Sequence, residues 1–504
     1  MIYLVSNNVF TYNNGPEFSQ FERLKAFNQN HLPTKLVLMQ YSPFFSYNLN
    51  RHQIDQQDVI NMYDYFQGNV GRTGEPLSIH QLANFDYSYY HLEGVDPDHS
   101  IFTFYDTKYG TVNIAPSSIC KVGDEEYLDQ NKKVRTRITW DRRGFVSRVD
   151  SYHLDGQLGT SRFLRSDGST AILVTRMNKD DKVQPTMWKL LDYHGHNYVF
   201  DSEIDLFTFF LNELNRKESG TFIIDRPNLE RAVLRVKGAK KISYLHDIPV
   251  DDPQNVQSSS LASSRQSTFD PGHQQKEHFD YLVFATKAER DQFEAKLSAV
   301  VPESQFEVAN DSYVSVVGHT HKMNRRHPIF VYRGMLDDER GIWEVVQAFV
   351  EIHHNIEGAT LKLQGFIGND KDMDRLKSQL KSLKLDQAVD FLPYSPTNDL
   401  SVLDDATIFL NATASEAFGM NMLEAMSRGV PVVSYNGHYL TDQLLTNDKN
   451  GLVIKSNTPD SLARAALSLL SHERYYDRLA KGALTTASQY SEQSMLKQWR
   501  EILK

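Results

Sequence analysis

Residues 408–434 read IFLNATASEAFGMNMLEAMSRGVPVVS, and they predict a strand, a loop, a helix and a second strand. The apolar run at the start ends near Asn411, and the helix is expected to begin near Met420. Gly429 and Pro431 are typical of a helix end, because glycine tolerates a left-handed backbone and proline cannot continue the helix. Strands that alternate with helices in this way indicate a parallel, doubly wound sheet.

The start of this helix predicts an anion site. Its first backbone N–H groups have no partner within the helix and lie at the positive end of the helix dipole, which suits a diphosphate. The residues around them are Phe418, Gly419, Met420 and Asn421. Glu416 lies just before the helix and Glu424 lies on it, and a carboxylate can accept hydrogen bonds from two vicinal hydroxyls of a sugar or a ribose. The alternative is that Glu416 is only a charge at a helix start and Glu424 lies on a solvated face.

The same alternation of strands and helices occurs elsewhere in the chain. Further strands are predicted at residues 1–5, 35–39, 222–225, 242–245, 281–286, 329–332 and 361–364. A helix starts near Glu17, and its apolar side is expected to contain Phe18, Phe21, Leu24 and Phe27. One strand ends in Asp225 and the next is followed by His246. For His246, the alternative to a functional role is a buried imidazole that is hydrogen-bonded at the strand end.

Between these α/β regions, from about residue 102 to residue 177, the helical period disappears and short β-type runs take its place. The turns between the runs contain Gly144, Gly156 and Gly168, spaced twelve residues apart. Asp precedes the last two glycines, and Asp-Gly between two β runs is a strong hairpin signal. We therefore expect an antiparallel β-meander inserted into the first domain.

The composition is that of a globular protein, with 40% hydrophobic and 23% charged residues among 504, and the length predicts two or three domains. No apolar run reaches the length of about 18 residues that a transmembrane helix needs, and the first residues do not resemble a signal peptide, so a cytoplasmic location is expected. Cys120 is the only cysteine, which excludes a disulfide within the chain and a multi-cysteine zinc site. The net charge of -10 argues against a general nucleic-acid binder.

Glu416 and Glu424, separated by seven residues and followed by Ala-Met-x-x-Gly-x-Pro-Val-Val, resemble the motif of retaining GT-B glycosyltransferases of the family-4 type. More narrowly, the chain is similar to the teichoic-acid α-glycosyltransferases and to the accessory-secretion glycosyltransferases (the A type) of serine-rich adhesins. The similarity includes residues 61–66, the β-meander, Ile224-Asp225-Arg226 and residues 490–499. It implies an α/β GT-B fold, in which two Rossmann-like domains face a cleft and an antiparallel β-meander domain is inserted in the first.

The resemblance implies five segments. They are the first part of the N-terminal Rossmann-like acceptor domain (1–69), the inserted β-meander domain for oligomerisation or acceptor handling (70–199), the second part of the N-terminal domain (200–325), the C-terminal nucleotide-sugar domain (326–487) and a C-terminal helix that returns to the N-terminal domain (488–504).

The resemblance also implies roles for single residues. Glu416 is expected to contact hydroxyls of the donor sugar, Glu424 to hold the ribose and His246 to lie beside the donor sugar. Asp225 is expected at the same cleft as a catalytic residue, and Arg226 on its acceptor side.

The phosphates are expected to lie near Gly15, where the absence of a Cβ lets the first loop approach, and near Arg340, where the family usually has Lys. The chain also departs from the family pattern elsewhere. Met335 stands in the usual Arg position, and Arg333 is the candidate to replace it. Ala417 replaces a common Gly, and Pro249 stands where relatives often have a second His.

The implied activity is a UDP-sugar-dependent, retaining hexosyltransferase that moves GlcNAc or glucose to Ser/Thr hydroxyls of a serine-rich bacterial surface protein. A poly(polyol-phosphate) teichoic acid is the alternative acceptor, and a non-catalytic partner subunit that presents acceptor is the alternative of another class. We expect no cofactor and no metal, because the UDP-sugar is a substrate. Asp370 and Asp372 resemble a metal-binding Asp-x-Asp, but a solvated helix start explains them better. The expected partners are a second copy or a homologous subunit and the inner membrane face, but no nucleic acid.

Overall fold

The computed structural model describes residues 1–82, 90–105, 107–179, 182–246, 250–252, 258–262, 278–298, 301, 304–317, 323–337, 340–367, 370–413, 418–437 and 444–504. The chain divides into two compact units. Unit 1 consists of Met1–Thr11, Thr34–Phe222 and Leu229–Ala239, and unit 2 of Tyr12–Pro33, Ile223–Asn228 and Lys240–Lys504.

Unit 1 contains a parallel sheet that begins at the N-terminus. Its strands β1 (Ile2–Ser6), β2 (Thr34–Leu38) and β3 (Val59–Asn61) lie side by side in that order, with Leu4 opposite Leu36. Both leucines are fully buried, which is expected for parallel strands covered on both faces. Strand β14 (Thr221–Ile224) begins in unit 1 and ends in unit 2. The strands predicted at residues 1–5 and 35–39 are therefore present.

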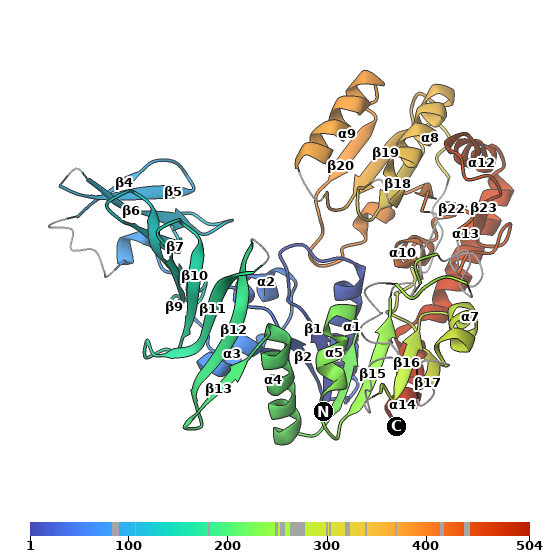
Figure 1. Ribbon diagram of the computed structural model, residues 1–504. Coiled ribbons are helices and arrows are strands. Elements are labelled where there is room, and N and C mark those ends of the chain that lie inside the picture. The colour runs from blue at the N-terminus through green and yellow to red at the C-terminus, as the bar shows by residue number, and fades with distance from the viewer. Residues whose placement is uncertain are drawn as a thin grey trace. The chain divides into compact units, whose positions relative to one another are not determined.

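The insertion is a ten-stranded antiparallel sheet in which every strand pairs with its neighbours in sequence, as Figure 1 shows. The strands are β4 (Tyr90–Gly94), β5 (His99–Phe104), β6 (Thr107–Ile114), β7 (Val122–Leu128), β8 (Val134–Trp140), β9 (Val146–Tyr152), β10 (Leu158–Leu164), β11 (Thr170–Lys179), β12 (Lys182–Tyr193) and β13 (His196–Phe200). The turn residues Gly144, Gly156 and Gly168 have φ of 81°, 86° and 83°, a left-handed conformation that favours glycine. The meander is thus confirmed, and its strands, from Tyr90 to Phe200, extend beyond the predicted β region of residues 102–177 on both sides.

Polar contacts join the insertion to the helix α3 (Met62–Gln67) within unit 1. The Gln67 side chain donates hydrogen bonds to the carbonyls of Ser147 and Leu164, at 2.8 and 2.7 Å. Arg143, in the turn between β8 and β9, forms buried ion pairs with Asp64 and Asp141, both at 2.7 Å. Because breaking a buried ion pair is costly, these contacts fix α3 on the sheet.

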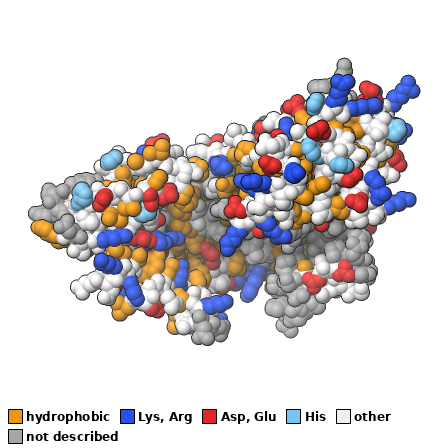
Figure 2. All heavy atoms as spheres, turned by 90° about the horizontal axis from the view of Figure 1, so that it is seen from above, with side chains coloured by type: hydrophobic (Ala, Val, Ile, Leu, Met, Phe, Trp, Pro, Cys, Tyr) orange, Lys and Arg blue, Asp and Glu red, His pale blue; other side chains and the backbone are white. Residues whose placement is uncertain are grey.

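The outer surface of the insertion carries exposed hydrophobic side chains. Figure 2 shows hydrophobic side chains among charged ones on this part of the face, at the left of the view. The most exposed of those in the described part of the insertion are Tyr105, Ile119, Leu154, Met177 and Val199. The strands β4 and β13 are the two edges of the sheet.

Unit 2 contains a second group of parallel strands and the helices that cover them. Strands β15 (Lys240–Leu245), β16 (Tyr281–Phe284) and β17 (Gln305–Val308) pair in that order. The helices of this part are α1 (Gly15–Gln29), α7 (Lys287–Leu297) and α14 (Glu492–Leu503), and α14 packs against α1. Trp499 of α14 is fully buried, and its ring lies 5.8 Å from Phe27 of α1.

The C-terminal sheet of unit 2 is a six-stranded parallel sheet with the order β20-β19-β18-β21-β22-β23 (Figure 1). Its strands are β18 (Ile329–Arg333), β19 (Thr360–Gln364), β20 (Val389–Leu392), β21 (Ile408–Asn411), β22 (Val432–Tyr435) and β23 (Gly451–Ile454). The accompanying helices are α8 (Ile342–Asn355), α9 (Asp370–Ser382), α10 (Met420–Ser427), α12 (Pro459–Ser471) and α13 (Glu473–Ala487). The strand order reverses between β18 and β21, and ligands of doubly wound sheets bind at the carboxyl ends of the strands at such a reversal.

Within the described residues, no helix is both long and apolar enough to span a membrane.

Candidate active site

The first group of candidate residues lies where strands of unit 2 end. Asp225 follows β14, His246 follows β15 and Asp311 comes shortly after β17, so all three are near the carboxyl edge of these parallel strands. Helix α1 supplies the side chains that contact them. The structure therefore brings together two residues that the sequence predicted, Asp225 and His246, and adds Asp311.

Asp225 is buried and accepts three hydrogen bonds. Its Oδ1 accepts from Arg23 Nη2 at 2.9 Å and from His246 Nε2 at 3.0 Å, and its Oδ2 accepts from Gln20 Nε2 at 2.5 Å. Burial alone would raise the pKa of Asp225, but the Arg23 guanidinium and the hydrogen bond from His246 hold it well below its usual range. A carboxylate with this many donors is ionised and fixed in orientation, which suits a positioning role better than that of a nucleophile.

His246 has a carboxylate on each side of its ring. Nε2 lies 3.0 Å from Asp225 Oδ1, and Nδ1 lies 3.4 Å from Asp311 Oδ2. Burial lowers the pKa of His246, but Asp311 and Asp225 outweigh it and raise the pKa from 6.5 to about 9. The ring is consequently an imidazolium at neutral pH, with both N–H groups directed at carboxylates. An imidazolium cannot act as a general base.

Arg23 and the His246 imidazolium together balance the charges of the two carboxylates. Its side chain is fully buried, and its Nη2 lies 2.9 Å from Asp225 and 3.5 Å from Asp311. The guanidinium carbon lies 5.0 Å from the ring centre of Tyr244 and 4.9 Å from that of Trp499. Guanidinium groups stack well on aromatic rings, and here the rings cover a charge that has left water.

The buried face of α1 differs from the prediction. Phe18 and Phe21 are only half-buried, whereas Gln20 and Arg23 are buried. Ser19 is also buried and donates to Asp311 Oδ2 at 2.7 Å. The physical reason is that α1 packs against polar strand ends, so its inner side must carry hydrogen-bonding groups.

The start of α1 holds Arg226. Glu17 of the first turn forms an ion pair with Arg226, and Asn14 Oδ1 accepts from Arg226 Nη2 at 2.9 Å. Gly15 is the first residue of α1, and a Cβ there would meet no atom within 4 Å. The acceptor role of Arg226 and the phosphate role of Gly15 stay predictions.

The second group of candidate residues flanks the reversal in the C-terminal sheet. Arg333 ends β18 and forms an ion pair with Glu424 of α10, and both are largely buried. The Arg333 Nε donates to Gln364 Oε1 at 2.9 Å. The side chain that was expected to replace the missing arginine at Met335 thus lies beside the carboxylate expected to hold the ribose.

Helix α10 begins at Met420, as predicted, and Gly419 caps it with φ of 84°. The ring of Phe418 lies edge-on to Tyr490 at 5.4 Å. Asn421 Nδ2 would lie 3.2 Å from a Cβ on Gly334, so glycine allows this close packing. Glu416, Ala417 and Pro249 lie outside the described residues, and what the sequence expects of them stays a prediction.

The backbone around Arg340 is held on both sides. Its N–H donates to Asp337 Oδ1 at 2.9 Å, and its carbonyl accepts from the hydroxyls of Tyr332 and Thr413 at 3.3 Å. Gly341 has φ of 73°, and a Cβ there would lie 2.6 Å from the Ala412 carbonyl, so only glycine fits. The phosphate role of Arg340 remains a prediction.

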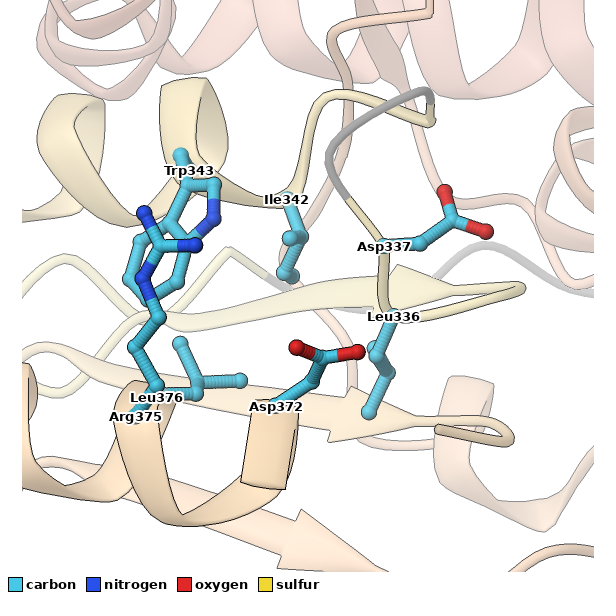
Figure 3. Close-up of a pocket in the computed structure, with 7 residues that line it drawn as sticks. All are labelled: Leu336, Asp337, Ile342, Trp343, Asp372, Arg375 and Leu376. Carbon is cyan, nitrogen blue, oxygen red and sulfur yellow. The ribbon is translucent and has the colours of Figure 1, made fainter. Parts of the chain in front are cut away.

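A pocket of about 350 Å³ is lined by Leu336, Asp337, Ile342 and Trp343 on one side and by Asp372, Arg375 and Leu376 of α9 on the other (Figure 3). Arg375 lies over the Trp343 ring at 5.4 Å, and the Asp372 carboxylate points toward Ile342. Among the described residues, no cluster of three or more His, Cys, Asp or Glu side chains could hold a metal ion.

The comparisons with known proteins agree with this geometry. Residues 320–485, which include the whole C-terminal sheet, match the family "Glycosyl transferases group 1". The chain is 21% identical over 528 residues to the "UDP-N-acetylglucosamine--peptide N-acetylglucosaminyltransferase GtfA subunit" of Streptococcus gordonii, covering 100% of this chain and 98% of that protein. It is 28% identical over 160 residues to the "Poly(glycerol-phosphate) alpha-glucosyltransferase" of Bacillus subtilis, but this match covers 32% of the chain and spans only 23% of that protein's length.

Among solved structures, the pneumococcal O-GlcNAc transferase GtfA in complex with UDP and GlcNAc superimposes with a TM-score of 0.82 at 17% identity, covering 100% of this chain and 98% of that one. The resemblance identified from the sequence is confirmed, and the chain has the GT-B fold with an antiparallel β domain inserted.

Proposed function

We propose that this chain is a retaining glycosyltransferase that moves GlcNAc or glucose from a UDP-sugar to Ser/Thr hydroxyls of a serine-rich bacterial surface protein. One observation carries the proposal: the alignment with the S. gordonii GtfA subunit, whose name gives a UDP-sugar donor and a peptide acceptor, covers essentially both chains. The short match to the B. subtilis enzyme supports the same reaction type with a different acceptor.

The donor half of the proposal is supported by the arrangement of Arg333, Glu424 and the start of α10. The ion pair leaves lone pairs of the Glu424 carboxylate that can accept from ribose hydroxyls. The helix start and basic side chains offer N–H donors and positive charge for a diphosphate. In the proposed reaction these groups stabilise the departing UDP without a metal ion.

For catalysis, we propose that the first group of residues acts through its charges and not as a general base. In a retaining transfer without a covalent intermediate, the acceptor oxygen attacks the face from which UDP leaves, and the leaving phosphate takes up the proton. The imidazolium of His246 would supply positive charge near the departing diphosphate and the donor sugar. Asp225 would orient that ring through its 3.0 Å contact, and Glu416 would bind hydroxyls of the sugar.

The assembly is part of the same proposal. Open edges of a sheet and exposed hydrophobic side chains commonly mark surfaces used for association, and the insertion of unit 1 has both. The S. gordonii relative is named as a subunit. We propose a homo-oligomer or a complex with a homologous subunit, in the cytoplasm, with peripheral contact at the inner membrane face.

A panel of UDP-sugars with two acceptors tests the function. The purified protein is incubated with UDP-GlcNAc or UDP-glucose and either a serine-rich peptide or teichoic acid, and products are measured by mass spectrometry. We expect a mass increase of one hexose or one N-acetylhexosamine on the peptide. Glycosylation of teichoic acid alone would transfer the assignment to that acceptor. Absence of both products and of UDP release would indicate a non-catalytic subunit.

A further inference from the structure

The side-chain amide of Asn398, in the loop after β20, joins three side chains. Its Oδ1 accepts from Arg333 Nη2 at 2.5 Å, and its Nδ2 donates to Glu424 Oε1 at 3.0 Å and to Glu22 Oε1 at 3.2 Å. Asn398 has φ of 54°, a left-handed conformation that asparagine tolerates better than most residues. The amide therefore sets the orientation of the Arg333–Glu424 ion pair.

Two carboxylates share this one amide. Glu22 belongs to α1 and also accepts a hydrogen bond from the Ser312 hydroxyl. Burial raises the pKa of Glu22 to about 7, and the Glu424 charge contributes to the rise in spite of the hydrogen bonds from Ser312 and Asn398. The electrostatic state of Glu22 thus depends on Glu424, although the two residues lie on different helices of unit 2, α1 and α10.

A second contact joins α1 to the loop after β20. The backbone N–H of Asn13, just before α1, donates to the Tyr394 hydroxyl at 2.7 Å, and that hydroxyl lies 3.1 Å from the Asn13 carbonyl. The ring of Phe18 lies 6.2 Å from that of Tyr394. The loop that carries Asn398 is therefore attached to α1 along more than one turn of the helix.

Helix α1 also contacts the first group of candidate residues, through side chains next to Glu22. Gln20 and Arg23, which flank Glu22 in the helix, bind Asp225, and Asp225 in turn binds His246. A movement of α1 at Glu22 moves Arg23 with it, because both side chains belong to the same helical turn. One rigid element thus connects the carboxylate expected at the ribose to the imidazolium expected at the sugar.

We infer that Asn398 is a positioning residue for the donor nucleotide, which orients Glu424 toward the vicinal hydroxyls of the ribose and, through Glu22 and α1, aligns the Asp225–His246 pair with the bound donor. This inference rests on the proposed function for the identity of the nucleotide. In this role Asn398 acts through the side chains of Arg333, Glu424 and Glu22 that it contacts. Its loss removes a donor to Glu424 and leaves the carboxylate free to turn within the ion pair with Arg333.

The first part of the inference is that Asn398 orients Glu424 toward the ribose. Calorimetry with UDP and 2′-deoxy-UDP tests it, since only UDP offers two vicinal hydroxyls. The wild-type protein should bind UDP about tenfold more tightly than 2′-deoxy-UDP, and Asn398→Ala should remove most of that ratio. Ser312→Ala is the matched control. It removes the hydrogen bond that the Ser312 hydroxyl donates to Glu22 but leaves the contacts of Glu424 in place, so the ratio of the two affinities should be kept. An unchanged ratio in Asn398→Ala, with an unchanged thermal midpoint that shows the variant is folded, overturns the inference.

The second part of the inference is that α1 couples the nucleotide site to the Asp225–His246 pair, and enzyme kinetics test it. Glu22→Gln preserves the volume and one acceptor oxygen, so KM for the UDP-sugar should stay within about twofold while kcat falls by about tenfold. A rise in KM with an unchanged kcat would show that α1 only helps to bind the nucleotide, and it would overturn the coupling. The two proposals fail differently: a wild-type protein that binds no UDP overturns the proposed function together with this inference, whereas UDP binding without the change in ratio overturns the inference alone.

Discussion

Replacing Asp225 by Asn tests whether the first group of residues works as a charge network. The substitution keeps the shape of the side chain but removes the negative charge that faces Arg23 and His246. The His246 pKa, raised from 6.5 to about 9 by Asp311 and Asp225 against the effect of burial, should then fall by at least one unit. Asp311 alone would remain to support two buried cations.

The size of the expected loss of stability follows from the shift in the His246 pKa. A difference of 2.5 units between the folded and the unfolded pKa corresponds to about 3 kcal/mol of folding free energy from the charged His246. Because the folded pKa is the higher one, this stability is fully present below pH 6.5 and is lost as the pH rises through about 9. Because Asp311 remains, Asp225→Asn removes only part of this stabilisation. A fall of one unit in the His246 pKa corresponds to about 1.4 kcal/mol, so the variant should lose at least that much below pH 6.5, and less near pH 9.5.

The assay combines NMR and denaturation. Spectra of protein with ¹³C-labelled histidine give the His246 titration, and its signal is assigned by its absence in His246→Gln. Urea denaturation at several pH values gives the free energy of unfolding. Asp390→Asn, which removes an exposed carboxylate on β20, is the control and should leave both measurements unchanged. A His246 signal that titrates near pH 6.5 in the wild type, or equally in Asp225→Asn, would refute the reasoning.

Four further predictions follow from the same site and fold. Glu416→Gln should lower the transfer rate by orders of magnitude while the protein stays folded, because a carboxylate contact to the sugar is lost, and a variant with about half the wild-type rate or more would contradict that role. Arg340→Ala should weaken UDP binding by about 2 kcal/mol in calorimetry, with a comparable loss for Arg333→Ala if that side chain replaces the arginine missing at Met335; unchanged affinities would place the phosphates elsewhere. Activity should survive excess EDTA, and a loss that Mg²⁺ or Mn²⁺ restores would make Asp370 and Asp372 candidate ligands again. Replacing the insertion by a short Gly/Ser linker should abolish assembly in light scattering and lower transfer to a long acceptor while UDP binding is kept, and an unchanged oligomer would exclude this role for the insertion.

The sequence predicted the C-terminal sheet well because its signals are local. The run 408–434 contains an apolar strand, a glycine at the helix start and a Gly-x-Pro stop, and the structure has β21, α10 and β22 at these places. The meander was recognised from its turn glycines. Strands such as β7 (Val122–Leu128) were not, because VGDEEYL has few apolar residues and Glu125 is nonetheless buried, with the Trp140 Nε1–H as its donor at 2.6 Å.

The site was predictable only in part, since its contacts join residues that are far apart in sequence. Asp225 and His246 were found because each follows a strand. Arg23 was missed because a polar residue on a helix is usually solvated, and only the tertiary structure reveals its two carboxylate partners. Asn398 lies in a loop without a motif, so its role as a shared amide could not be recognised from the sequence.

The even number of strands in the insertion constrains how this domain can change in evolution. In a meander of ten antiparallel strands, the first and last strands run in opposite directions. The start of β4 and the end of β13, which leads into α4 (Glu203–Lys217), therefore face the same way along the strands, at opposite edges of the sheet. Adding or deleting a single strand would reverse the direction in which the chain leaves the last strand toward α4. Growth or loss should therefore occur one whole hairpin at a time. The repeat of twelve residues between Gly144, Gly156 and Gly168 gives duplication a ready-made unit, two of which make one hairpin. Sheets of different length in related chains should accordingly differ by pairs of strands.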